Sequence, residues 1–369
     1  MTTYLKRGAL LMSFLLTAIA ASGCHKNNPV VPVVPVDSTT APPPIIIPGD
    51  SLNAYGFTVS GFGSSGSNLV AGAYTTATAA VFIFLSKDDG LTWKLEFSFP
   101  VISSSPGFNF FLTPSADFAN DATVLLAGAY NALRGAIYRS TDQGLTWSDS
   151  GVTWPESGEY DLDENINCLC LSDGKIFSGT DHGVFVSGDH GSTWSLAGPK
   201  IPPATSIVST GGSIFASTSA QGIYRSTDQG ASWAEVDTSR YNFLSLAVNG
   251  TDVFVGAVEA APGPSSGGVF ETTDNGNTWH HVDAELPDHY VDAVCTYGAY
   301  LFAGTNSGVF VSSDTGAVWT QIAGPNVRVN EFLVHGGYLF GNSGGGVWRY
   351  PLSSLPSLDE HESRKLSQK

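Results

Sequence analysis

The sequence predicts an all-β fold built from repeated units, and a repeated peptide and the composition both point to it. The peptide Ser-x-Asp-x-Gly-x-Thr-Trp, or a close variant, occurs six times, and its closing tryptophans lie 54, 47, 39, 46 and 40 residues apart. A period of this size is typical of propellers and solenoids, in which each repeat buries its apolar face against its neighbours. The 42 glycines, 11% aromatic residues and 13% charged residues suit a chain rich in strands and turns.

Each copy of the peptide has the features of a hairpin tip. Two apolar runs, such as residues 183–186 and 194–196, flank an Asp-x-Gly turn. The Asp carboxylate and the Ser or Thr hydroxyl can accept hydrogen bonds from the turn's amides, and glycine permits a positive φ. The tryptophan then begins the next strand, where it can wedge between neighbouring sheets. We therefore expect a structural role for the six aspartates, which are Asp88, Asp142, Asp189, Asp228, Asp274 and Asp314.

A second recurring motif, here called the upstream phrase, precedes the peptide and gives the number of repeats. Five copies pair an aliphatic with an aromatic residue, at 176–179, 214–217, 253–256, 301–304 and 339–342, and earlier relatives without the aromatic residue lie at 69–73 and 125–129. Each unit then consists of strand a, a short turn, strand b, a connection, strand c, the Asp turn and strand d. The seventh unit ends near 346–350 without an Asp turn, and a strand around 45–52 could complete it and close the ring. The prediction is a single seven-bladed β-propeller over 51–352, followed by a polar tail at 353–369.

The repeated peptide resembles the Asp-box, or BNR, repeat of sialidases and related propellers. In that family the box is a structural turn on the face opposite the active site. The chain is also similar to the photosystem II stability/assembly factors, which are seven-bladed Asp-box propellers that act as non-catalytic assembly scaffolds. Those factors carry an arginine-rich patch that this acidic chain lacks. The resemblance therefore implies a platform for another macromolecule rather than their specific role.

The N-terminus has the pattern of a secretory signal. Lys6 and Arg7 precede an apolar run at 9–21, which has the length of a signal-peptide core. The run ends in Ala-Ser-Gly-Cys24, which resembles a bacterial lipobox with Ala in place of the preferred Leu. This implies a signal peptide at 1–23 and lipidation of Cys24 in the cell envelope. Because His25 is not the Asp that favours inner-membrane retention, the outer membrane is expected; an ordinary secretory signal remains the alternative.

The segment 24–50 and the net charge restrict the partners. The prolines of residues 24–50 favour an extended polyproline tether with little capacity to fold. Without the signal peptide, 14 basic residues remain against 33 acidic ones, a net charge of −19. Such a surface repels phosphate backbones and anionic lipids. We therefore expect that the protein does not bind nucleic acid and that it contacts the membrane through its N-terminal lipid only. The protein is expected to be a monomer.

Long insertions point to one face of the propeller. The a–b turns and the Asp boxes share one face, here called the box face, while the b–c and d–a connections share the opposite one, the loop face. The insertions fall on the loop face, at 74–80, 130–135, 154–165, 259–267 and 283–290. Loops on a rigid scaffold usually carry function, so this face should bind a protein or glycan. The ligand-binding candidates are Trp154, Glu156, Tyr160, Asp161, Asp163, Arg134, Arg240, Arg328, His289 and Tyr290.

The residues that sialidase chemistry requires are not evident. A sialidase uses three arginines, a Tyr–Glu nucleophile pair, an acid/base Asp and a Phe/Tyr-Arg-Ile-Pro phrase, and that phrase is absent. Arg139, Arg225 and Arg349 occupy one repeated position of strand c, so they belong to the repeat. The prediction is a non-catalytic binding protein with no cofactor; an exo-acting glycoside hydrolase of sialidase-like type is the alternative.

Metal binding is not expected either. Asp161-x-Asp163-x-Asn165 begins like a calcium loop, but Ile166 and Ser172 replace the Gly and Glu that the EF-hand pattern requires. A solvated acidic loop is the favoured interpretation, and calcium binding at 159–165 stays open.

Overall fold

The computed structural model describes residues 45–46, 58–74, 80–100, 111–114, 125–131, 134–149, 166–219, 221–237, 239, 241–259, 267–283, 285–323, 328–343 and 346–356. Within these residues the strands pair into seven antiparallel four-stranded sheets. Six of the sheets are blades made of four consecutive strands. The first three blades are β2 (Thr58–Ser65), β3 (Asn68–Tyr74), β4 (Ala80–Ser86) and β5 (Lys94–Pro100); β6 (Phe111–Pro114), β7 (Leu125–Asn131), β8 (Arg134–Ser140) and β9 (Ser148–Asp149); and β10 (Ile166–Ser172), β11 (Lys175–Thr180), β12 (Gly183–Ser187) and β13 (Ser195–Leu196).

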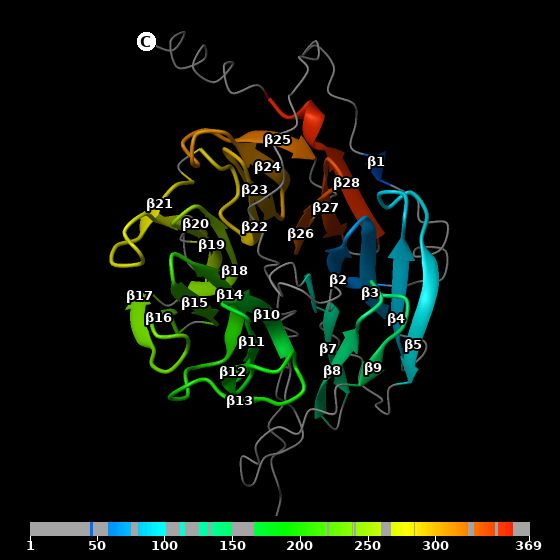
Figure 1. The fold of residues 1–369 in the computed structure, drawn as a ribbon. Coiled ribbons are helices and arrows are strands. Elements are labelled where there is room, and N and C mark those ends of the chain that lie inside the picture. The colour runs from blue at the N-terminus through cyan, green and yellow to red at the C-terminus, as the bar shows by residue number, and fades with distance from the viewer. Residues whose placement is uncertain are drawn as a thin grey trace, which may run out of the picture.

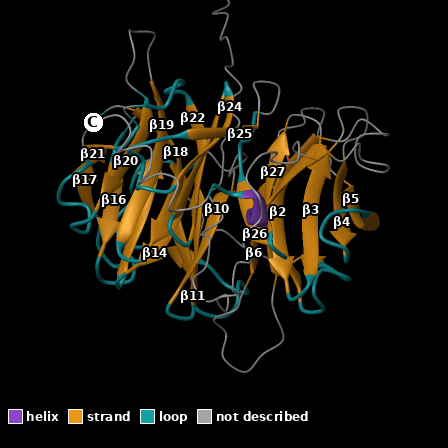
Figure 2. Cartoon of the chain, turned by 90° about the horizontal axis from the view of Figure 1, so that it is seen from above, coloured by secondary structure: helices purple, strands orange, loops and turns teal. Residues whose placement is uncertain are grey.

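The next three blades repeat this order. They are β14 (Ala204–Thr210), β15 (Ser213–Thr218), β16 (Ile223–Ser226) and β17 (Ala234–Asp237); β18 (Tyr241–Asn249), β19 (Asp252–Glu259), β20 (Gly268–Thr272) and β21 (His280–His281); and β22 (Val291–Tyr297), β23 (Tyr300–Thr305), β24 (Gly308–Ser312) and β25 (Thr320–Ala323). The innermost strand of each blade stands near the centre of the ring and the outermost lies at its rim (Figure 1). The side view shows the strands crossing the thickness of the ring (Figure 2).

The remaining sheet, called the composite sheet, joins the two ends of the propeller. Its order is β1 (Ile45–Ile46), β28 (Gly346–Pro351), β27 (Tyr338–Ser343) and β26 (Phe332–His335). β1 is antiparallel to β28, with Ile45 opposite Arg349 and Ile46 opposite Trp348. The all-β propeller is confirmed. The described chain completes six blades from consecutive strands rather than the seven units expected, because its last three strands take their outer strand from the N-terminal side.

The repeated upstream phrase forms the second strand of its blades and fills the space between sheets. Its aromatic residue is almost fully buried in five sheets, with exposures of 0% to 1% for Phe177, Phe215, Phe254, Phe302 and Phe340. β26 and β27 contact β2, so the composite sheet lies beside the first blade (Figure 1). Apolar packing between neighbouring sheets therefore continues from the last sheet to the first.

The Asp boxes form tight turns held by their own side chains. In the third box, Ser187 Oγ donates to Asp189 Oδ1 at 2.8 Å, and the carboxylate accepts from the backbone N–H and Oγ of Thr193 at 2.8 and 2.6 Å. The two central residues, His190 and Gly191, have φ values of 61° and 82°. These are the left-handed angles of a type I′ hairpin turn. In the fifth box, the backbone N–H and hydroxyl of Thr278 lower the pKa of Asp274 to about 2.

The first and fifth boxes also contact the preceding sheet. A Cβ on Gly90, which has φ +77°, would lie 2.8 Å from the Phe340 ring of the composite sheet. Arg349 of the same sheet donates through Nη1 to the Asp89 carbonyl at 2.8 Å, and Arg225 donates to the Asn275 carbonyl of the next box. These two arginines of the repeated strand c position thus tie one sheet to the next box.

A short C-terminal segment follows β28 at the place where the other blades have a box. The 3-10 helix η1 (Leu352–Ser354) leads to Pro356, whose carbonyl accepts a hydrogen bond from Tyr300 Oη at 2.8 Å. Leu352 and Leu355 pack against the buried residues of the last two sheets. The start of the expected polar tail is therefore part of the packed structure. Among the described residues, no helix is long and apolar enough to cross a bilayer.

Candidate functional site

Three of the predicted ligand-binding residues lie within the described structure with their side chains: His289, Tyr290 and Arg328. Arg134 is the first residue of β8, and of this residue only the backbone is described. The other candidates fall outside the described residues, as does Cys24; they are Trp154, Glu156, Tyr160, Asp161, Asp163 and Arg240.

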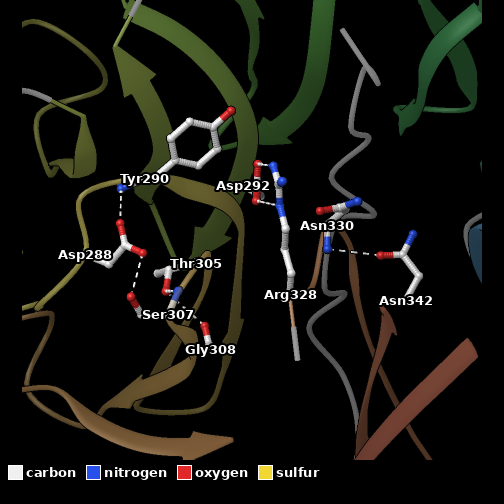
Figure 3. A network of polar contacts seen from close by, with 9 residues as sticks. All are labelled: Asp288, Tyr290, Asp292, Thr305, Ser307, Gly308, Arg328, Asn330 and Asn342. Carbon is white, nitrogen blue, oxygen red and sulfur yellow. Dashed lines mark hydrogen bonds and ion pairs between the residues drawn. The ribbon is translucent and has the colours of Figure 1, made fainter. Parts of the chain in front are cut away.

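Tyr290 and Arg328 meet on the loop face. Tyr290 directly precedes β22 and Arg328 precedes β26, so they lie on the d–a connections that enter two neighbouring sheets. The Cζ atom of Arg328 lies 5.3 Å from the centroid of the Tyr290 ring (Figure 3). This is the distance of a cation–π contact.

Asp292 fixes the orientation of Arg328. The guanidinium donates from Nε to Asp292 Oδ2 at 2.7 Å and from Nη2 to Oδ1 at 3.0 Å (Figure 3). The Asp292 side chain is 1% exposed and that of Arg328 is 50% exposed. Burial raises the pKa of Asp292 although Arg328 acts to lower it, while the hydrogen bond to Asp292 raises the pKa of Arg328. A bidentate pair of this kind sets the plane of the guanidinium.

Sequence reasoning missed Asp292 because it lies inside an innermost strand, where buried apolar residues are expected. It occupies a bulge between Val291 and Ala293. The same bulged position holds Asn167 in β10 and Thr205 in β14. A polar residue recurring at one position of strand a was the signal available in the sequence.

The connection that carries Tyr290 is held by a second carboxylate. Asp288 accepts from the Tyr290 backbone N–H at 2.9 Å and from Ser307 Oγ at 2.8 Å (Figure 3). Tyr290 itself is 40% exposed. The site therefore presents an exposed aromatic ring whose backbone and neighbouring cation are both fixed by hydrogen bonds.

His289 turns toward a different partner. Its Nδ1 lies 2.7 Å from Asp283 Oδ2, and His281 Nδ1 lies 3.2 Å from Asp283 Oδ1. Asp283 is 2% exposed. His289 thus helps to hold the connection rather than joining Tyr290 and Arg328. In the described part of the chain, no three His, Cys, Asp or Glu residues are placed to hold a metal ion.

Comparison of the sequence with protein families identifies a BNR/Asp-box repeat at residues 138–149, which contain the second box. The chain therefore contains a BNR/Asp-box repeat within a β-propeller fold. A comparison with curated proteins finds no match.

Solved structures share the propeller. The extracellular domain of a hybrid two-component system from B. thetaiotaomicron aligns with a TM-score of 0.57 and 14% identity, covering 81% of this chain and 38% of that chain. A GH74 xyloglucanase from Xanthomonas campestris aligns with a TM-score of 0.57 and 17% identity, covering 82% of this chain and 53% of that chain. The structure of YCF48 bound to D1 peptide aligns with a TM-score of 0.58 and 14% identity, covering 92% of this chain and 99% of that chain. The chain therefore spans well under two thirds of the first two, and at these identities the likeness concerns the fold.

Proposed function

We propose that this Asp-box propeller is a non-catalytic binding protein of the bacterial cell envelope, and that a protein or glycan binds to its loop face. The observation that carries the proposal is the arrangement of Tyr290, Arg328 and Asp292. An exposed aromatic ring beside an oriented guanidinium can stack on a sugar ring or a peptide side chain while offering polar contacts. Because both groups are held before a ligand arrives, binding loses less conformational entropy.

One structural neighbour supports a macromolecular ligand. The YCF48 structure contains a D1 peptide, and this chain spans 99% of that protein. A propeller of the same extent can therefore hold a peptide. We propose a peptide or glycan segment for this chain without carrying over the identity of that ligand.

The location and the shape of the protein belong to the same proposal. Lipidation of Cys24 would anchor the chain in the outer membrane. Residues 24–50 would then connect this anchor to a monomeric propeller. The composite sheet would serve as the seventh blade and close the ring. The net charge of −17 for the whole chain argues against nucleic acid as a ligand.

A glycoside hydrolase of exo-acting, sialidase-like type is the second candidate. Two carboxyls at the loop-face ends of innermost strands, Asp292 and Glu331, have raised pKa values, and a raised pKa suits a general acid. Against this function, both oxygens of Asp292 accept hydrogen bonds from Arg328. The binding function is therefore the one we favour.

The test is a binding screen with paired tyrosine variants. The purified protein is applied to peptide and glycan arrays and incubated with chromogenic glycosides. Tyr290→Ala should weaken ligand binding at least tenfold, whereas Tyr297→Ala should not. Tyr297 is the matched control because it is 38% exposed and ends the same strand at the box face. Equal loss in both variants would exclude the loop-face site, and glycoside hydrolysis abolished by Asp292→Asn would favour the hydrolase.

A further inference from the structure

Neighbouring blades are joined by side chains that bind a backbone amide of the next innermost strand. Ser206 Oγ accepts a hydrogen bond from the Leu246 N–H at 3.1 Å, and Ser245 Oγ accepts one from the Val294 N–H at 3.0 Å. Both serines directly follow the bulge of their strand. A neutral hydroxyl therefore links each of these two pairs of blades.

The composite sheet makes the equivalent bond to the first blade with a carboxyl. Phe332 stands at the serine position and has no acceptor in its side chain. Glu331, one residue earlier, instead accepts a hydrogen bond from the Phe62 backbone N–H. Phe62 holds the place in β2 that Leu246 and Val294 hold in their strands. The link between the last sheet and the first thus depends on a group that can ionise.

The surroundings of Glu331 disfavour its charged form. The residue is 3% exposed, and its Oε2 atom has no hydrogen-bond partner among the described residues. Burial raises the pKa of Glu331 well above its usual value, although the Phe62 amide acts to lower it. A carboxylate without a cation or further donors is costly in such an interface, whereas a protonated carboxyl is tolerated.

The ionisable groups on the neighbouring elements do not supply a counter-charge. β2 contains no ionisable residue. Asp292 of β22 is paired with Arg328, and Arg349 of β28 donates to the Asp89 carbonyl. His335 and Tyr338 face each other at the opposite end of β26 and β27.

We propose that the contact between the composite sheet and the first blade is closed by a protonated Glu331 and loosens as this carboxyl ionises. The native pKa lies above that of the unfolded chain, about 4.3. The stabilisation is therefore complete below the unfolded value and is lost as the pH rises through the native value. Because Arg328 and Glu331 lie on the same connection, loosening at Glu331 would reach the Tyr290 site.

Amide hydrogen exchange tests this in the intact protein. The protection factors of the Phe62, Leu246 and Val294 amides are measured by NMR as the pH is raised, with correction for intrinsic exchange. Protection of Phe62 should fall by up to tenfold per pH unit above the native pKa of Glu331. The protection factors of the Leu246 and Val294 amides, which donate to serine hydroxyls, should not change with pH.

The matched variant is Glu331→Gln, which keeps an acceptor for the Phe62 amide and removes the ionisation. Protection of Phe62 should become independent of pH in this variant. A Phe62 amide that follows Leu246 and Val294 at every pH in the wild-type protein overturns the proposal, and so does an unchanged pH dependence in the glutamine variant. The wild-type comparison decides the matter if the variant does not fold.

Discussion

Single side chains of the Asp box stabilise its turn through hydrogen bonds that the backbone alone does not supply. Asp142 accepts from the Thr146 N–H and Oγ at 2.8 and 2.5 Å. Asp142→Ala should therefore lower the free energy of unfolding by about 1 kcal/mol, the scale of a lost capping bond, with ligand affinity unchanged. Urea denaturation measures the loss. Thr141→Ala is the control because this exposed neighbour lies outside the Ser140–Asp142–Thr146 bonds; a similar loss there would contradict the capping role.

The box tryptophans contribute in proportion to their burial. Trp147 is 6% exposed and donates from Nε1 to the Gly144 carbonyl at 2.9 Å. Trp147→Ala should cost roughly 3 to 5 kcal/mol of unfolding free energy, because it leaves a cavity in the packed turn. Trp279→Ala should cost less, since that side chain is only partly buried. Denaturation curves that show the reverse order would refute this reasoning.

The turn-forming role of the box residues could be predicted from the repeat, whereas the connections only supplied candidate positions for ligand binding. The box aspartates stand out because their serine and threonine partners recur at fixed offsets, and Tyr290 and Arg328 stand out because they lie in connections. Asp292 and Glu331 do not, because a single acidic residue within the first residues of a strand or just before it is expected to be exposed to solvent. Their burial results from the bulge and from the neighbouring sheet, which sequence periodicity does not reveal.

At the scale of elements, the composite sheet depends on a very short strand. β1 supplies two residues opposite Trp348 and Arg349. Ile46→Pro should lower the melting temperature and increase amide exchange in β28, because proline removes a donor and restricts the backbone. Ile46→Val, which keeps a β-branched side chain, should have little effect. Exchange in β28 that is identical in both variants would show that β1 does not support the sheet.

The strands of the units were predictable from the alternation of apolar runs and Gly-containing turns. The residues of β1 were harder to assign, because prolines at 42–44 and 48 give its sequence the composition of a tether. An N-terminal strand was expected around 45–52 from the missing partner of the last unit rather than from its own residues. Pairing with β28 is a tertiary effect that local propensity does not contain.

At the scale of the whole molecule, attachment and binding should be separable. Cys24→Ala should release the protein from membranes and abolish acyl labelling, because several acyl chains anchor far better than an acidic surface can. Membrane fractionation measures this, and the released protein should keep its ligand affinity. Fractionation that is unchanged in the variant would exclude the lipid anchor.

The joining of both ends in one sheet also governs the order in which the chain can fold. A blade of four consecutive strands can form as soon as its residues are available, because its contacts are local. The contact between Arg349 and Asp89 instead spans 260 residues. Contacts of such sequence separation form slowly because the intervening chain must first be brought together. The packing of the first blade against the composite sheet must therefore wait for the C-terminal strands, and a chain truncated before β26 would leave that apolar surface exposed and prone to aggregation.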